Sequence, residues 1–159
     1  MLETIQAFLE KHLGDAGHAV KGNDERALQL AAATLLMEVA RADSQISAAE
    51  RQVVRRVIED HFSLSPEITN EIAEAAEHEA EHATSLHPMT RLINDECSSA
   101  DRAQVIKMLW AVTYADGQID PHEEHLVRKL ADLLHVPHRE FIRAKLQVVR
   151  GAPAKDGER

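Results

Sequence analysis

Acidic residues recur in one stretch near the C-terminal end of the chain, "YADGQIDPHEEHLV", residues 114–127, at a spacing found in metal-binding loops. When this stretch is aligned with the calcium loop of an EF-hand, Asp116, Asp120 and Glu123 take the places of ligands in the second half of the loop. Carboxylates at that spacing are typical of sites for hard divalent cations. The stretch therefore raises the question of whether it binds a metal ion.

The first half of the same alignment does not supply ligands. Its two ligand positions fall on Val112 and Tyr114, neither of which is a carboxylate. Calcium takes about 6–8 oxygen ligands, and one such turn offers far fewer side-chain oxygens. An EF-hand is therefore excluded, whereas a weaker, hydrated or shared site for a divalent cation stays open.

Helix capping accounts for much of the stretch without any ligand. Gly117 suits the left-handed conformation in which helices often end. Asp120 is a favourable N-cap, Pro121 suits the first helical position, and Glu123 stands where the second half of a capping box is found. The sequence therefore predicts a helix–turn–helix here.

A second copy of this pattern occurs earlier in the chain. The segment "ARADSQISAAERQVVRRV", residues 40–57, aligns with "TYADGQIDPHEEHLVRKL", residues 113–130. The acids that recur are Asp43 and Glu50 in the first copy and Asp116 and Glu123 in the second. Two such units predict a bundle with a pseudo-two-fold internal repeat, and the sequence leaves open whether the turns lie side by side.

Asp43 and Asp116 are the residues that capping explains least. Both are expected at helix C-termini, where the helix dipole disfavours negative charge. Each carboxylate could accept a hydrogen bond from the amide two residues further on, as in an Asx-turn. Each could instead face a cation or a basic side chain of a partner.

The segment "HEAEH" matches the pattern of zinc proteases, with His78 and His82 as ligands and Glu79 as base. It lies in an Ala- and Glu-rich helix, and no strand is expected that could hold a peptide substrate. A zinc hydrolase is therefore a remote alternative. Glu79 also falls on an apolar helical stripe, where a carboxylate should be paired, lie at the rim of the core, or act as a ligand. A buried ion pair with an arginine or lysine is the favoured expectation.

Composition favours helices and limits the partners. Hydrophobic residues make up 44% of the 159 residues but aromatic residues only 3%, with 6 glycines and 5 prolines. The net charge of −9 argues against nucleic acid as a partner. A single cysteine and the lack of a stretch of about 20 apolar residues predict a cytoplasmic protein without a transmembrane segment.

The sequence divides into three parts. Residues 1–24 are expected to form an amphipathic helix, Leu2–Leu13, and a linker. Residues 25–150 form the helical domain, and residues 151–159 are expected to be a disordered tail. The predicted helices of the domain are 25–41, 47–61, 65–84, a short one after Pro88, one capped by Ser98 or Ser99 that ends at Tyr114, 121–134 and 137–150. Ser47 and Glu50 are expected to form a capping box at the start of the second of these helices, and Ser65 is expected to cap the third, with Pro66 at its first helical position.

The chain resembles the TerB family of tellurite-resistance proteins. The likeness rests on "LLMEVARADSQISAAE", "LINDE" and "MLWAVTYADGQIDPHEEHLVRKLADLLHVPHREFIRAK", and it covers roughly residues 25–148. It implies an all-α, single-domain bundle of seven to eight helices with a pseudo-two-fold internal repeat. The acidic positions that it implies as metal ligands, for calcium, magnesium or manganese, are Asp43, Glu50, Asp116, Asp120 and Glu123. The chain departs from the family pattern at Ser44 and Ser47, where glycine and aspartate are common.

The expected function follows from the acidic turns together with the family resemblance. We expect a non-enzymatic protein that binds a divalent cation through the two acidic turns and acts in tellurite resistance or stress response through protein partners. The resemblance places such partners at the inner face of the bacterial membrane. The main alternative is a docking module that needs no metal, and a zinc hydrolase through His78, Glu79 and His82 is the remote one.

Overall fold

The computed structural model describes residues 20–42 and 45–151, and within them the chain forms seven α-helices and no strand. The predicted all-α fold is therefore confirmed. The predicted segment at residues 2–13, the tail from residue 152, and residues 43 and 44 lie outside the described residues. The helices are α2 (Val20–Ala40), α3 (Ala48–Phe62), α4 (Pro66–His82), α5 (His87–Glu96), α6 (Ser99–Thr113), α7 (Pro121–Leu133) and α8 (His138–Gly151).

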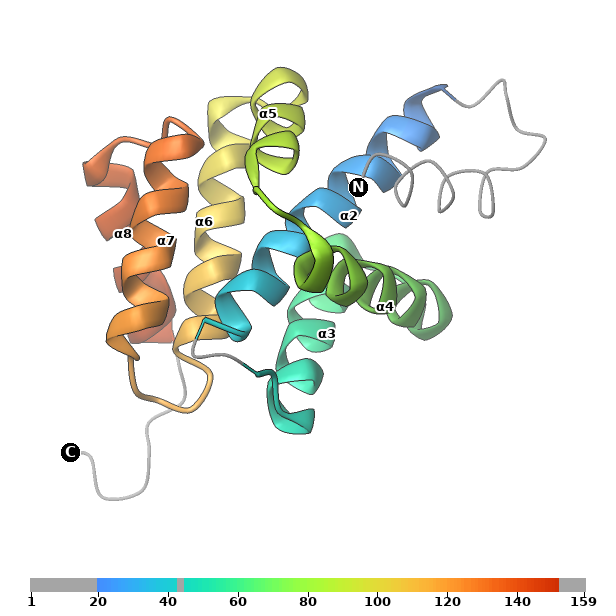
Figure 1. Cartoon of the computed structure of the whole chain (residues 1–159). Helices are drawn as coiled ribbons and strands as arrows, with labels where there is room; N and C mark the ends of the chain where they lie inside the picture. Colours follow the sequence, from blue (N-terminus) through green and yellow to red (C-terminus); the bar gives the residue numbers. More distant parts are fainter. Residues whose placement is uncertain (1–19, 43–44, 152–159) are drawn as a thin grey trace.

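Helix α2 runs through the middle of the bundle, and α3, α4, α5, α6 and α7 all contact it (Figure 1). From Leu30 to Ala40 its residues are buried except for Glu38, which is half-buried. A helix that is apolar around its whole circumference must be enclosed by other helices. The many alanines in this stretch, including Ala31, Ala32 and Ala33, let the neighbouring helices approach closely.

The starts of four helices follow from local capping chemistry. The side chains of Ser47, Ser65, Ser98 and Asp120 accept hydrogen bonds from backbone N–H groups in the first turns of α3, α4, α6 and α7. These bonds satisfy donors that the helix itself cannot pair. The predicted N-caps of these helices are confirmed.

The start of α2 differs from the prediction. The helix begins at Val20, inside the segment that the sequence analysis assigned to a linker. Gly22 and the polar residues around it are weak helix formers, which is why their composition suggested a linker. Once a long helix exists, however, each added residue costs little, and α2 therefore extends through them.

Helix α8 packs against α6 and α7. Trp110 of α6 is completely buried, and its indole Nε1 donates a hydrogen bond to the carbonyl oxygen of Phe141 at 3.3 Å. The two rings lie 5.1 Å apart between centroids. This contact satisfies the one polar group of a large buried side chain and so fixes α8 on the bundle.

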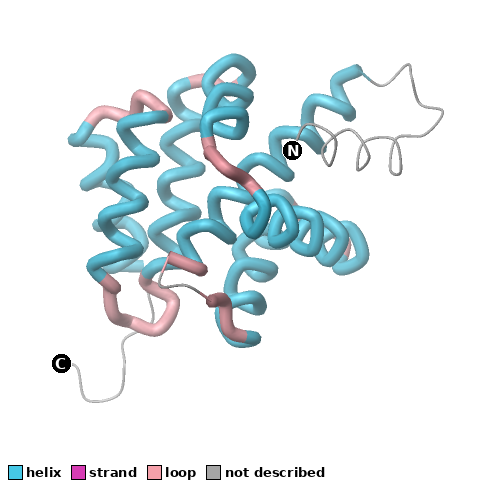
Figure 2. The backbone as a smooth tube through the Cα atoms, viewed as in Figure 1, coloured by secondary structure: helices cyan, strands magenta, loops and turns pink. Residues whose placement is uncertain are grey.

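The two copies of the sequence repeat form two helix–turn–helix units, α2–α3 and α6–α7. Their long first helices, α2 and α6, contact each other. Figure 2 shows that α2 and α6 end at the same end of the bundle, where the segments that lead to α3 and α7 begin. Ile46 and Ile119, at equivalent places in the two repeats, are half-buried and pack against the core. In the described part of the chain, no helix is long and apolar enough to cross a membrane.

Candidate functional site

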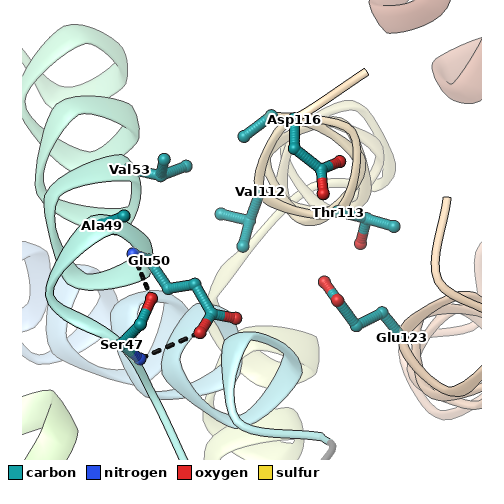
Figure 3. A pocket seen from close by; sticks show the side chains of 9 residues that line it. Ser47, Ala49, Glu50, Val53, Val112, Thr113, Asp116 and Glu123 are labelled. Atoms are coloured by element: carbon teal, nitrogen blue, oxygen red, sulfur yellow. Dashed lines mark hydrogen bonds between the residues drawn. The ribbon is translucent and has the colours of Figure 1, made fainter. Parts of the chain in front are cut away.

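A pocket of about 420 Å³ lies between the two turns, and we call it the inter-turn pocket. It is formed by the start of α3, the end of α6 with the turn after it, and α7 (Figure 3). Its apolar walls are Ala49, Val53, Val112 and Ala115, and its polar lining is Ser47, Thr113, Glu50, Asp116 and Glu123. The turns are thus side by side, a point that the sequence left open.

Asp116 stands in the turn after α6 and forms the predicted Asx-turn. Its Oδ1 accepts a hydrogen bond from the backbone N–H of Gln118 at 2.9 Å. Gly117 between them has a φ of 82°, the left-handed conformation expected for it. The hydrogen bond offsets the cost of an acid near a helix C-terminus. Asp116 also lines the pocket, and Figure 3 shows its carboxylate on the same side as that of Glu123.

Asp120 and Glu123 play separate parts at the start of α7. The Oδ1 of Asp120 accepts hydrogen bonds from the backbone N–H groups of His122 at 2.7 Å and Glu123 at 3.3 Å. Asp120 is therefore a capping residue and is not among the residues that line the pocket. The side chain of Glu123 extends into the pocket, toward Thr113 and Asp116 (Figure 3).

Glu50 in the first turn is held by its own helix start. Its Oε1 accepts a hydrogen bond from the backbone N–H of Ser47 at 2.9 Å, and its own N–H donates to the Ser47 hydroxyl at 3.1 Å. This is a complete capping box, as predicted. Glu50 therefore contributes negative charge to the pocket wall while its carboxylate is turned back toward Ser47 (Figure 3).

Three of the five predicted metal ligands, Glu50, Asp116 and Glu123, thus line one pocket, whereas Asp120 caps α7 and Asp43 lies outside the described residues. Over residues 20–42 and 45–151, no three His, Cys, Asp or Glu side chains are grouped closely enough to hold a metal ion. The described residues alone therefore do not fit an enclosed calcium site, which takes about 6–8 oxygen ligands.

The zinc-hydrolase alternative is not supported by the arrangement of α4. The imidazole rings of His78 and His82 are exposed and lie 4.3 Å apart between centroids. Glu79 between them is only 3% exposed and packs on the core side of the helix. A base in such an enzyme must reach a metal-bound water, so a buried Glu79 does not suit that role.

The environment of Glu79 also differs from the expectation. The carboxylate is buried, but among the described residues no ion pair is seen that would match the predicted partner arginine or lysine. The nearby guanidinium of Arg41 donates instead to the carbonyl oxygen of Ala80 at 3.0 Å. The C-terminal carbonyls of α4 thus attract this cation, as the helix dipole favours.

The apolar walls of the pocket were not among the features predicted from the sequence. Val112 counted there only as a failed ligand of a calcium loop, whereas in the structure it faces Val53 across the pocket (Figure 3). Val112 falls on a ligand position that a valine cannot serve, and Val53 aligns with no ligand position at all. Only the packing of α3 beside α6 brings them together as walls of one pocket.

The fold and the site define a class of protein: an all-helical domain in which two repeated helix–turn–helix units place acidic turns around one pocket. The chain belongs to the TerB family, because the family model described as "Tellurite resistance protein TerB" matches residues 29–146. This family is not known as a catalytic one. No curated protein and no solved structure matches the chain.

Proposed function

We propose that this chain is a non-catalytic interaction protein whose inter-turn pocket binds a cationic side chain, Lys or Arg, of a protein partner. The observation that carries the proposal is the composition of the pocket: Glu50, Asp116 and Glu123 surround a cavity with valine and alanine walls. Three carboxylates around one cavity create a negative potential that attracts cations. Apolar walls suit the aliphatic stem of a long basic side chain better than they suit a bare metal ion.

The family match supports a proposal for the setting of this activity. The family description names tellurite resistance, and we propose that the chain acts there, or in a related stress response, through protein partners in the cytoplasm. Because the pocket recognises charge and an aliphatic stem, the partner would present its Lys or Arg on an exposed loop or terminus. A tellurite-sensitivity assay with pocket variants tests this setting.

A divalent cation is the second candidate ligand. It is favoured by Asp116 and Glu123, whose carboxylates enter the same space from two different segments (Figure 3). Two carboxylates and several waters would bind calcium, magnesium or manganese only weakly. Such an ion would be shared between the turns, in keeping with the repeat.

The two candidates are separated by titrating the ¹⁵N-labelled protein with a pentalysine peptide and, in parallel, with calcium, magnesium and manganese. Shifts of the Gln118 and Glu123 amides report binding in the pocket. The variant Asp116→Asn/Glu123→Gln removes two charges, yet an asparagine can still accept the Gln118 hydrogen bond. We expect its affinity for the peptide to fall about tenfold, equivalent to about 1.4 kcal/mol.

Glu124→Gln is the matched control, because Glu124 is the next residue on α7 and pairs outside the pocket with Lys145 at 3.3 Å. It should bind pentalysine like the wild type. Metal binding at sub-millimolar concentration that is lost in the double variant, without peptide binding, would favour the second candidate. If the pocket amides respond to no titrant, the proposed function is wrong.

A further inference from the structure

Helix α8 presents a basic stripe to solvent. Arg139, Arg143, Leu146 and Arg150 are exposed and follow one another at intervals of four, three and four residues, so they lie along one face of the helix. We call these four residues the α8 stripe. Leu146 is 38% exposed, one of the most exposed large apolar side chains in the described residues. This is an unusual surface for a chain with a net charge of −9.

The positive charge extends beyond α8 itself. A groove of about 230 Å³ between α6 and α8 has Lys107 on one side and Arg143 on the other, with Ala103 and Ala144 among its lining residues. Arg143 pairs with Glu140 on its own helix at 3.3 Å and remains 59% exposed. Glu140 thus offsets part of the charge of Arg143, while Arg139, Arg150 and Lys107 add further positive charge to this surface.

Helix α4 presents the opposite charge on the other side of the molecule. Glu67, Glu74 and Glu81 are exposed at intervals of seven residues, with the exposed Asn70 and His78 between them. We call the three glutamates the α4 stripe. Figure 1 shows α4 and α8 on opposite sides of the bundle, so the two stripes of one molecule cannot meet.

We propose that a second copy of this chain docks its α4 stripe onto the α8 stripe of the first. Charge complementarity carries the proposal, since one copy supplies a row of glutamates and the other a row of arginines. The spacing supports it as well, because both rows repeat at the roughly seven-residue period with which neighbouring helices stay in contact. The proposal does not involve the inter-turn pocket and stands apart from the proposed function.

The geometry predicts how the copies assemble. The two surfaces are different and lie on opposite sides, so the contact is head-to-tail, and each added copy leaves one of each stripe open. Helices of 14 and 17 residues are about 21 and 25 Å long, and such a contact buries less than the ~1,200 Å² of a stable complex. The association is therefore weak, concentration-dependent and sensitive to salt.

Sedimentation equilibrium of the full chain tests this. At about 10 mM salt, where charges act over about 30 Å, we expect the weight-average mass at about 1 mM protein to be about twice the 17.7 kDa of the monomer. At about 1 M salt the range falls to about 3 Å, and the monomer mass should return. A wild-type chain that stays monomeric at low salt would overturn the proposal.

Two variants and their mixture give the decisive result. Arg139→Glu/Arg143→Glu makes the α8 stripe acidic, and Glu74→Lys/Glu81→Lys makes the α4 stripe basic, so each variant alone should be monomeric. An equimolar mixture restores opposite charges at the contact and should regain the wild-type mass. Recovery in the mixture also shows that both variants are folded, and far-ultraviolet circular dichroism confirms it.

Glu96→Lys/Asp132→Lys is the control for net charge, because these exposed acids lie on α5 and α7 and the change in charge is the same as in the α4 variant. It should associate like the wild type. The proposal is overturned if the mixture stays monomeric. It is also overturned if the wild type is monomeric but binds phosphatidylglycerol vesicles through Arg139 and Arg143, because a lipid surface would then cover α8.

Discussion

In the first turn the carboxylate of Glu50 bonds back to the N–H of Ser47, whereas in the second turn the equivalent Glu123 extends into the inter-turn pocket (Figure 3). The two helix starts differ at the N-cap, which is a neutral serine in the first turn and Asp120 in the second. They also differ at the next two positions, which are alanines in α3 and Pro121 and His122 in α7. A glutamate that folds back over an aspartate meets a like charge, which disfavours the reciprocal capping bond. We infer that the charge of the N-cap helps to decide whether the glutamate bonds back to its own helix start or extends into the pocket.

The two turns therefore differ in their use of charge. The first turn uses its glutamate for capping, so we expect it to contribute mainly to stability. The second turn has a charged N-cap and a glycine in the left-handed conformation, and its acids Asp116 and Glu123 both line the pocket. We expect the second turn to contribute most of the affinity for a ligand in the inter-turn pocket. The following substitutions test this division.

The largest effect on stability is expected for Gly117→Ala. A residue with a side chain is strained at a φ of 82°, and we expect the free energy of unfolding to fall by about 1–2 kcal/mol. Urea denaturation measures this. Gly151→Ala is the control, because a methyl group there would meet no atom within 4 Å, and it should change stability little. Equal losses in both variants would contradict a special requirement at the second turn.

Loss of the N-caps comes next. Asp120→Ala should lower the free energy of unfolding by about 1 kcal/mol or slightly more, and Ser47→Ala by about 1 kcal/mol. Asp120 should be the costlier loss because it accepts two backbone hydrogen bonds, whereas the Ser47 hydroxyl accepts one. Thermal and urea unfolding of both variants give the comparison. A much larger loss at Ser47 would mean that the first turn depends more on its cap than its geometry suggests.

A smaller effect, a gain in stability instead of a loss, is expected when Glu38 near the end of α2 is replaced. Burial raises the pKa of its carboxyl group, and Arg41 at 3.9 Å partly offsets this. The folded state therefore prefers the protonated form, and stability is lost as pH rises from the ordinary carboxyl pKa through the raised one.

Glu38→Gln should accordingly increase the free energy of unfolding at pH 7 by less than about 1 kcal/mol, and the gain should disappear at low pH. Unfolding curves over a pH series measure it. The equivalent residue in the second repeat is Ala111, so the α6–α7 unit has no counterpart of this effect. A gain that persists below the ordinary carboxyl pKa would exclude ionisation as its cause.

The smallest change in stability is expected for Asp120→Ser, which gives the second turn the N-cap of the first. Serine and aspartate are comparable caps, so stability should change by less than about 0.5 kcal/mol. With a neutral cap, Glu123 can fold back as Glu50 does, and pentalysine binding should weaken severalfold. The ¹⁵N titration described above measures it. Unchanged binding would show that the N-cap does not control the direction of Glu123.

The sequence predicted those features that depend on neighbouring residues. Capping by Ser47 and Asp120, the Asx-turn of Asp116 and the left-handed Gly117 all follow from contacts within a few residues. The pocket did not follow, because its walls join α3 to α6 through packing between segments far apart in the chain.

Two features of the helices, the start of α2 and the partner of Glu79, differ from the predictions for the same physical reason. The start of α2 at Val20 depends on extension of a long helix through residues that favour it weakly. The partner expected for Glu79 was inferred from burial alone, whereas Arg41 bonds to a helix-end carbonyl instead. In both cases the local residue types were interpreted correctly, but the outcome depended on structure beyond the neighbouring residues.

Trp110 gives the molecule a built-in optical reporter. It is the sole tryptophan of the chain, and its indole is fully buried with its N–H bonded to Phe141 of α8. Its emission should be blue-shifted while α8 stays in place and should move to longer wavelength if that helix peels away. A spectrum recorded without any label can therefore tell whether a change to the arginines of α8 alters the surface alone or detaches the helix.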